Sequence, residues 1–116
     1  MAGYTGGVRW LYHVRIRTTD DAWPYAPESF AKEHFIHASF RDAVLESASL
    51  YFSTDTTLEI LAIDPRRLTA KIEIATTPRG PMPHILGPID RDAVTRIWPL
   101  ASFNPKRLPD RIDETI

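Results

Sequence analysis

The segment from Val8 to Ile16 alternates between two kinds of side chain with a period of two, and this pattern constrains the fold more than any other. Alternation over this length predicts a half-buried β-strand. We expect the apolar set to face the core and the other set, which includes His13 and Arg15, to lie on the opposite face. The apolar set is Trp10, Tyr12, Val14 and Ile16, and the other set is Arg9, Leu11, His13, Arg15 and Arg17.

One principal helix is predicted in the first half of the chain. Apolar side chains recur at helical spacing over residues 40–52, which indicates an amphipathic helix. Ser39 is expected to be its N-cap, with Asp42 at the capping-box position. Residues 24–34 contain two prolines and are expected to form a loop or a single turn.

The rest of the chain is predicted to contain short strands. Leu58–Ile63 is almost wholly apolar, as expected for a strand covered on both faces. Prolines and a glycine between Thr77 and Pro83 predict a stiff loop. Further strands or extended pieces are expected at residues 35–38, 70–76, 84–89 and 94–100. Five or six short strands, one principal helix and no βαβ alternation predict an α+β fold with a mainly antiparallel sheet.

The length of 116 residues fits one domain. Residues 1–7 are small and are expected to form a flexible leader. Residues 8–100 are expected to form a single α+β domain. Residues 101–116 follow the last predicted strand with prolines and mixed charge, so they are expected to form a C-terminal tail laid over the surface or frayed.

The composition argues against several classes of function. Fourteen basic and fifteen acidic residues give a net charge of −1, whereas generic nucleic-acid binding calls for a basic excess or a basic stripe. The absence of cysteine removes disulfides, thiolate metal sites and cysteine nucleophiles. No apolar stretch approaches the ~20 residues that cross a bilayer, so a cytoplasmic location is expected. Phosphate-binding glycine loops, dinucleotide glycine motifs and the nucleophile elbow are not present in the sequence.

Three histidines are expected to line one polar cleft. His13 lies on the non-core face of the first strand, His37 directly precedes the predicted helix, and His84 follows Pro83 in a rigid stretch. The N-terminus of that helix, together with Ser39, would give His37 an anion-binding corner. Each histidine also has an ordinary interpretation, as a surface group, a satisfied core group or part of a tight chain crossing.

Metal binding is an alternative use of the same residues. His34 and His37 form an H-x-x-H pair, but the segment is predicted to be loop and strand rather than helix. A zinc site made from His13, His37 and His84 would be a three-histidine catalytic arrangement, although no tight ligand spacing supports it. No metal ligand is therefore assigned.

Charged residues of the predicted strands and the helix start supply further candidates. Glu73 lies on the polar face of its strand beside Lys71, and a carboxylate in a cleft stabilises an oxocarbenium ion or orients a ribose hydroxyl. Arg15, Arg17 and Arg41 are candidates for guanidinium groups that face a phosphate. A solvated surface charge is the commoner role for each of these residues.

Four motifs follow one another along the chain. They are Leu11-Tyr12-His13-Val14, then Glu33-His34-Phe35-Ile36-His37-Ala38-Ser39, then Glu73, then Pro83-His84-Ile85-Leu86-Gly87-Pro88. In this order they resemble a bacterial and plant family known as domain of unknown function 952, over about residues 10–100. His34 stands where that family has Gly, Met82 where it has Phe, and Leu86 where it has Tyr.

The resemblance implies a fold like that of the ADP-ribosylating enzymes and the NAD-dependent RNA phosphotransferases. It implies that His13 holds the NAD ribose, that His37 lines the same cleft, and that Glu73 is the later acidic residue. His84 belongs to the family's own motif and receives no transferase role from the likeness. Likeness of fold does not by itself establish an activity.

The leading hypothesis is a cleft that binds NAD or an ADP-ribosyl group and transfers or hydrolyses it. The predicted catalytic residues are His13, His37, His84 and Glu73, and the predicted ligand-binding residues are Tyr12, Arg15 and Ser39. His84 would be a general acid or base, because an ordinary imidazole pKa near ~6.5 suits proton transfer at neutral pH. The alternatives are a non-catalytic module that binds a nucleotide or a partner protein, and a metal-assisted hydrolase.

Overall fold

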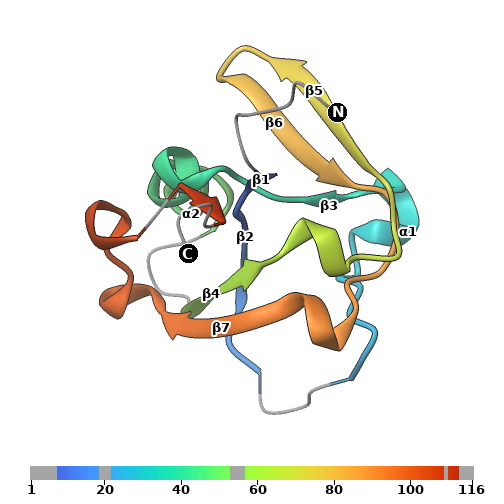
Figure 1. Ribbon diagram of the computed structural model, residues 1–116, viewed down its shortest axis with the longest axis horizontal. Coiled ribbons are helices and arrows are strands. Elements are labelled where there is room, and N and C mark those ends of the chain that lie inside the picture. Colours follow the sequence, from blue (N-terminus) through green and yellow to red (C-terminus); the bar gives the residue numbers. More distant parts are fainter. Residues whose placement is uncertain (1–7, 19–21, 53–56, 109, 113–116) are drawn as a thin grey trace.

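Three small sheets make up the strand part of the fold in the computed structural model, which describes residues 8–18, 22–52, 57–108 and 110–112 (Figure 1). The strand orders are β2-β4-β7, β3-β6-β5 and β1-β8. The strands are β1 (Val8–Arg9), β2 (Leu11–Ile16), β3 (Ile36–His37), β4 (Leu58–Ile63), β5 (Ile72–Thr77), β6 (Gly80–Ile85), β7 (Val94–Pro99) and β8 (Arg111–Ile112). The α-helices are α1 (Phe30–Glu33) and α2 (Val44–Tyr51).

The predicted α+β class is confirmed, with antiparallel pairing between every pair of neighbouring strands in the described ranges. Strands β2, β4, β5, β6 and β7 have six residues each, and β1, β3 and β8 have two each. The sequence predicts fewer strands because it treats β1 and β2 as one strand, and because β8 is too short to show a period.

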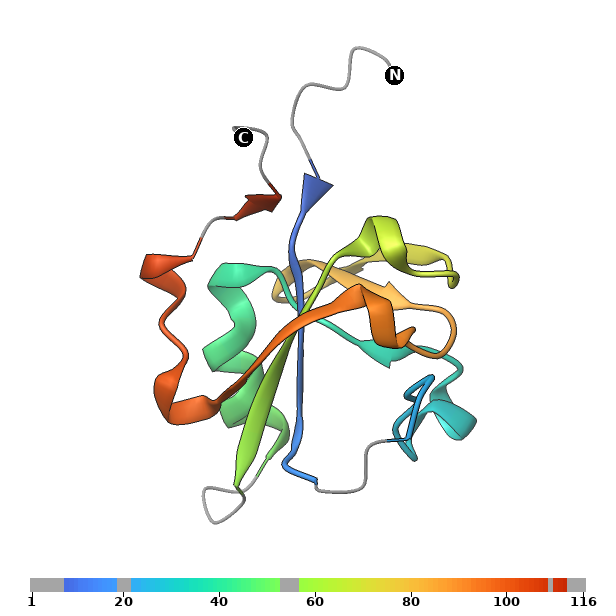
Figure 2. The same cartoon turned by 60° about the horizontal axis from the view of Figure 1, so that its bottom comes forward.

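Strand β2 is covered on both faces, so the prediction of a half-buried strand is wrong. Tyr12 packs against α2 and the C-terminal segment, while Leu11 packs against β3 and β6 on the other face. Figure 2 shows α2 on one side of β2, and α1 and the β5–β6 hairpin on the other. His13 and Arg15 continue the face of Leu11 and are 6% and 4% exposed, whereas Ile16 on the predicted core face is 58% exposed. A second sheet covers the face that was expected to be polar.

Residues 36–39 join the first two sheets. The N–H of Ala38 donates to the carbonyl of Pro83 at 3.2 Å, on the side of β6. Tyr12 and Ser39 exchange both of their backbone hydrogen bonds, at 2.9 and 2.8 Å, on the side of β2. This segment therefore lies between β2 and β6 and is bonded to each of them (Figure 1).

The predicted stiff loop before His84 is wrong, because it is mostly strand β6. The carbonyl of Pro83 points toward β3, and in an antiparallel strand the N–H side of a residue points the same way as its carbonyl. Pro83 and Pro81 therefore turn their hydrogen-free nitrogens toward β3, which is only two residues long. Prolines are tolerated where no neighbouring strand needs the missing donor. Gly80, at φ +96°, makes the tight return from β5.

The start of the principal helix also differs from the prediction. Phe40 is extended (φ −78°, ψ 162°), residues 41–43 form a 3₁₀ turn, and α2 begins only at Val44. Ser39 is therefore not the N-cap, and no side chain caps either segment. The hydroxyl of Ser39 instead bonds Ser47 on α2 at 2.8 Å. The anion-binding corner predicted beside His37 does not form, because the chain turns away before the helix starts.

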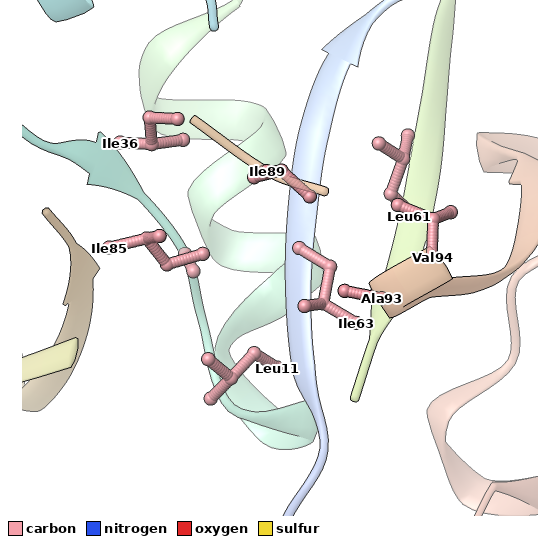
Figure 3. Packing of buried hydrophobic residues seen from close by; sticks show 9 residues of the cluster. Leu11, Ile36, Leu61, Ile63, Ile85, Ile89, Ala93 and Val94 are labelled. Atoms are coloured by element: carbon pink, nitrogen blue, oxygen red, sulfur yellow. The ribbon is translucent and has the colours of Figure 1, made fainter. Parts of the chain in front are cut away.

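The core consists of two clusters on the two faces of β2. Figure 3 shows the first cluster, in which Ile36 of β3 and Ile85 of β6 pack together with Leu61 of β4 and Val94 of β7. The second cluster lies under α2 and includes Phe103, which is 6% exposed. The segment after residue 100, expected to be a surface tail, thus supplies a core side chain. The predicted leader, residues 1–7, lies outside the described residues.

Candidate functional site

A cavity of about 1510 Å³ opens between β2, β3, β6, α1 and α2. It is larger than the usual range of roughly 300–1,000 Å³ for small-molecule pockets. Its lining comes from chain segments that are far apart in sequence. The lining includes Tyr12, His13, Arg15, Tyr25, Glu33, His37, Ser39, Ser47, Tyr51, Arg79, Met82 and His84.

The structure brings His13, His37 and His84 to this one cavity. His37 and His84 are cross-strand partners of β3 and β6, with ring centroids 5.7 Å apart. His13 reaches the same place from β2, where its Nδ1 lies 2.7 Å from the carbonyl oxygen of His37. The three rings therefore share a pocket, as the sequence predicts.

His13 is held as a neutral imidazole of one tautomer. A carbonyl oxygen only accepts, so the Nδ1 of His13 carries the proton and donates it to His37. The Nε2 atom is then the acceptor, and it lies 3.4 Å from the hydroxyl of Tyr25. Burial lowers the pKa of His13 to about 4, and the charges of Arg15 and His37 act in the same direction. At neutral pH this ring presents a hydrogen-bond acceptor rather than a charge.

His37 is hydrogen-bonded to a carboxylate at the mouth of the cavity. Its Nε2–H donates to the Oε2 of Glu33 at 3.0 Å, and the two side chains are 41% and 40% exposed. Phe35 contacts the ring edge to face at 4.7 Å, and Tyr51 lies 5.4 Å away. Tyr51 is the last residue of α2, so that helix contributes its final side chain to the surroundings of His37.

His84 stacks on Phe35 with the ring centroids 3.8 Å apart and an interplanar angle of 10°. Burial lowers the pKa of His84, with a further lowering from the charge of His37, while Glu73 and Glu33 raise it. Glu73 pairs with His84 across β5 and β6 but is exposed and does not line the cavity. The predicted acidic residue thus lies beside the site rather than inside it.

The inner wall of the cavity contains a buried ion pair. The Nε of Arg15 donates to Glu59 at 2.6 Å, and the guanidinium lies 4.9 Å from the ring centroid of Tyr25. Arg15 lines the cavity, but Glu59 offsets its charge. Burial raises the pKa of Tyr25, and the neighbouring Arg15 lowers it in part. Arg15 and Glu59 therefore hold the wall against which Tyr25 and His13 are placed.

A hydroxyl network closes the end of the cavity near α2. Ser39 bonds Ser47, and Nη2 of Arg79 donates to Ser47 at 3.0 Å and to the carbonyl of Ala43 at 3.3 Å. The Nε of Arg79 donates to Glu46 at 2.8 Å. The hydroxyl of Ser39, predicted to bind ligand, is thus bonded within the protein.

The other predicted groups have structural surroundings. Tyr12 lines the cavity, but its side chain packs in the core, where burial raises its pKa to about 12. Arg17 is exposed and outside the lining. Arg41 bonds Asp42 and the carbonyl of Leu108 on another part of the surface. Arg17 and Arg41 therefore do not line the cavity.

The described residues contain no group of three or more His, Cys, Asp or Glu side chains placed to hold a metal ion. The three-histidine zinc arrangement therefore has no support in the geometry. Across the same residues, no helix has the length and apolar character needed to span a membrane.

Comparison with known proteins places the chain in a family. Residues 15–97 match the family described as "Protein of unknown function (DUF952)". The chain belongs to the DUF952 family. The fold is similar to the crystal structure of protein CC0527 from Caulobacter crescentus, with a TM-score of 0.64 and 22% identity over 78% of this chain and 84% of that one. A double mutant of CC0527 matches equally well, with 21% identity over the same shares of the two chains. No curated protein matches.

The DUF952 motifs acquire a physical meaning in this structure. His34, which stands where the family motif has Gly, ends α1 in the left-handed conformation (φ 65°, ψ 15°). Glycine adopts that conformation without a steric cost. Met82, in place of Phe, lines the cavity and is 8% exposed, and Leu86, in place of Tyr, is exposed. The likeness to ADP-ribosylating enzymes that the motifs imply stays a prediction.

Sequence reasoning missed five residues of this DUF952 site. Glu33 was within reach, because it lies four positions before His37 in the same motif. Tyr25, Tyr51 and Arg79 have no local signal, since tertiary contacts alone bring them to the cavity. Glu59 is hidden in an apolar strand, where its register partner Arg15 lies 44 residues away in sequence.

Proposed function

We propose that this cavity binds a nucleotide or NAD-like ligand, with His13 accepting a hydrogen bond from a ribose hydroxyl. The observation that carries the proposal is the locked tautomer of His13. Its Nδ1–H is committed to the carbonyl of His37, so Nε2 is left as a neutral acceptor at the cavity wall. A buried neutral acceptor suits an uncharged hydroxyl or amide better than an anion.

The hydroxyl of Tyr25 supports this assignment. It lies 3.4 Å from Nε2 of His13, a distance at the long end for a hydrogen bond. The contact is weak enough for a ligand hydroxyl to compete for the same acceptor. Tyr25 itself lies over Arg15, which fixes one side of its ring.

The aromatic groups at the mouth supply a place for a planar base. Tyr51 and His37 line the cavity with their rings 5.4 Å apart and 32° from parallel. Bases and nicotinamide stack on such rings, with a free energy of roughly 1–3 kcal/mol for each base. The cavity volume of about 1510 Å³ leaves room for a second ring system.

A non-catalytic binding module is the second candidate. It is favoured by the position of Glu73, which lies outside the cavity lining, and by the neutralisation of Glu59 by Arg15. Neither carboxylate is available in the cavity as the acid of an ADP-ribosyl transfer. Binding without turnover would identify this module.

The test is a titration of isotope-labelled protein with millimolar NAD and, separately, ADP-ribose, with the histidine ring signals followed by NMR. We expect the signals of His13, His37 and His84 to shift and those of His34, which does not line the cavity, to stay in place. Unmoved signals for all three cavity histidines at millimolar ligand would exclude the proposed function.

Two variants sharpen the test. Tyr25→Phe removes the competing hydroxyl together with its hydrogen bond to Arg15, and we expect ligand affinity to be kept or raised. His13→Gln removes the imidazole acceptor, and we expect at least about tenfold weaker binding, which corresponds to roughly 1.4 kcal/mol. His34→Asn is the matched control, because Asn tolerates the left-handed backbone and the residue is outside the cavity. Thermal unfolding of each variant verifies that it is folded.

A further inference from the structure

Stacking of a base uses the face of the His37 ring and leaves the hydrogen bond between His37 and Glu33 without a role. We propose that His37 is the general base of a hydrolytic reaction in this cavity and that Glu33 is its positioning residue. The base takes a proton from water that attacks the glycosidic carbon of the bound nucleotide. This inference rests on the proposed function and adds a reaction to it.

The geometry fixes which nitrogen acts. Glu33 accepts a hydrogen bond from Nε2–H of His37 at 3.0 Å, so in the neutral ring the lone pair is on Nδ1. Phe35 contacts the ring at 4.7 Å and Tyr51 at 5.4 Å, which limits its rotation. An imidazole oriented by a carboxylate on one nitrogen, with no hydrogen bond from the described residues at the other, is the arrangement of a general base.

The local backbone creates this contact. Glu33 is the last residue of α1, and His34 reverses the chain in the left-handed conformation before β3 begins at Ile36. Both side chains of the pair are about two-fifths exposed, and an exposed pair of this kind contributes little to stability. The same exposure lets water and substrate reach His37.

The other two cavity histidines are less suited to the role. Both nitrogens of His13 have partners, and its pKa of about 4 makes it a weak base at neutral pH. His84 has a lowered pKa and stacks on Phe35. Among the histidines of the described residues, His37 is the one whose ring is hydrogen-bonded to a carboxylate.

The charges around His37 favour a reaction that builds positive charge. Glu33 faces it from α1, and the ring of Tyr51 faces it from the last position of α2. His84 faces it from β6, with Glu73 beside His84 on β5. His13, from β2, has its pKa lowered by the charge of His37. Negative groups close to the site stabilise the oxocarbenium character that develops at a glycosidic carbon.

The reaction is balanced with water as the co-reactant. The water oxygen forms a bond to the anomeric carbon of NAD, and the bond from that carbon to the nicotinamide nitrogen breaks. The electron pair of the broken bond stays on the pyridinium nitrogen, which becomes neutral nicotinamide. The water proton passes to Nδ1 of His37 and then to solvent, and ADP-ribose is the other product.

The experiment measures nicotinamide release from NAD by chromatography, using the full chain. We expect His37→Gln to lower kcat at least about 100-fold, the usual loss for a general base. Glu33→Gln should lower kcat about tenfold with little change in KM. A merely structural role would not lower kcat while leaving KM in place. Asp92→Asn removes the same charge from an exposed turn outside the cavity and should leave the rate unchanged.

The outcomes separate the two proposals. If NAD shifts the histidine signals but the wild-type chain releases no nicotinamide, the inference is overturned while the proposed binding function stands. Release at the wild-type rate by folded His37→Gln would also overturn it. If NAD does not bind at all, the proposed function fails and the inference fails with it.

Discussion

The cavity has an inner end and an outer end that use the same residue type in opposite ways. At the inner end, His13 is 6% exposed, and Arg15 and Glu59 are buried beside it as an ion pair. At the outer end, His37 and Glu33 are each about two-fifths exposed. The inner polar groups have their partners within the protein, whereas the outer groups meet solvent. This difference teaches that burial, and not residue identity, decides which histidine is held as a neutral hydrogen-bond acceptor and which is open to solvent for proton transfer.

The largest expected effect comes from breaking the inner ion pair. Glu59→Ala leaves the Arg15 guanidinium buried without its carboxylate, and such changes cost roughly 3–5 kcal/mol of unfolding free energy. Glu73→Ala, at an exposed position on β5, is the matched control and should change stability by less than about 0.5 kcal/mol. Urea unfolding measures both. Equal losses in the two variants would show that the buried carboxylate of Glu59 contributes no more to stability than an exposed one.

The second effect is a loss of stability in mild acid. His13 is neutral at pH 7 in both states, so it contributes no pH dependence there. Below its unfolded pKa of about 6.5, the unfolded chain binds a proton that the folded chain excludes until about pH 4. The free energy of unfolding therefore falls as the pH falls through this window, by on the order of 3 kcal/mol in total.

His13→Gln tests that assignment by urea unfolding at pH 7 and pH 4.5. The variant should show a much flatter pH dependence, with the remainder coming from the lowered pKa of His84, which has the same sign. An unchanged slope in the variant would place the acid sensitivity elsewhere.

A smaller effect is expected at the turn that leads to the outer end. His34→Gly relieves the left-handed backbone and should stabilise the protein by about 0.5–1 kcal/mol, the net of steric relief and greater freedom of the unfolded chain. His34→Val should destabilise it, because a β-branched residue is strained at positive φ. Thermal unfolding measures both changes. Destabilisation by glycine would refute the account of this turn.

The smallest effect is a change in the pKa of His84, whose ring lies beside that of His37. His37→Gln removes a charge that lowers the pKa of His84, so that pKa should rise toward its usual value. The rise should be incomplete, since burial is the larger cause and is unchanged. An NMR titration of the His84 ring follows it. A pKa that falls in the variant would contradict the described coupling of the two rings.

Local patterns predicted much of the fold. The apolar run of Leu58–Ile63 gives β4, with all six residues buried, and the short apolar run before residue 39 gives β3. The prolines of β6 led to the prediction of a loop. A sequence does not show that their nitrogens face β3, a strand too short to need the missing N–H donors. Ser39 predicted a helix cap because its tertiary partners, Tyr12 and Ser47, are not visible locally.

The residues of the candidate site that belong to sequence motifs could be predicted. His13, His37 and His84 belong to separate motifs, and the structure brings them to one cavity. The division of labour among them depends on burial and hydrogen bonds, which require the three-dimensional arrangement. Nothing in the sequence distinguishes the locked ring of His13 from the solvent-facing ring of His37.

The strip of chain at residues 36–39 has a mechanical consequence. Ala38 is hydrogen-bonded to Pro83 of β6 on one side, and Ser39 to Tyr12 of β2 on the other. The sheets that contain β2 and β6 therefore cannot separate at this point without breaking those bonds. A ligand that leaves these bonds intact enters through the existing opening of the cavity. Any accommodation to its shape falls to side chains at the rim, such as Tyr51, rather than to a hinge.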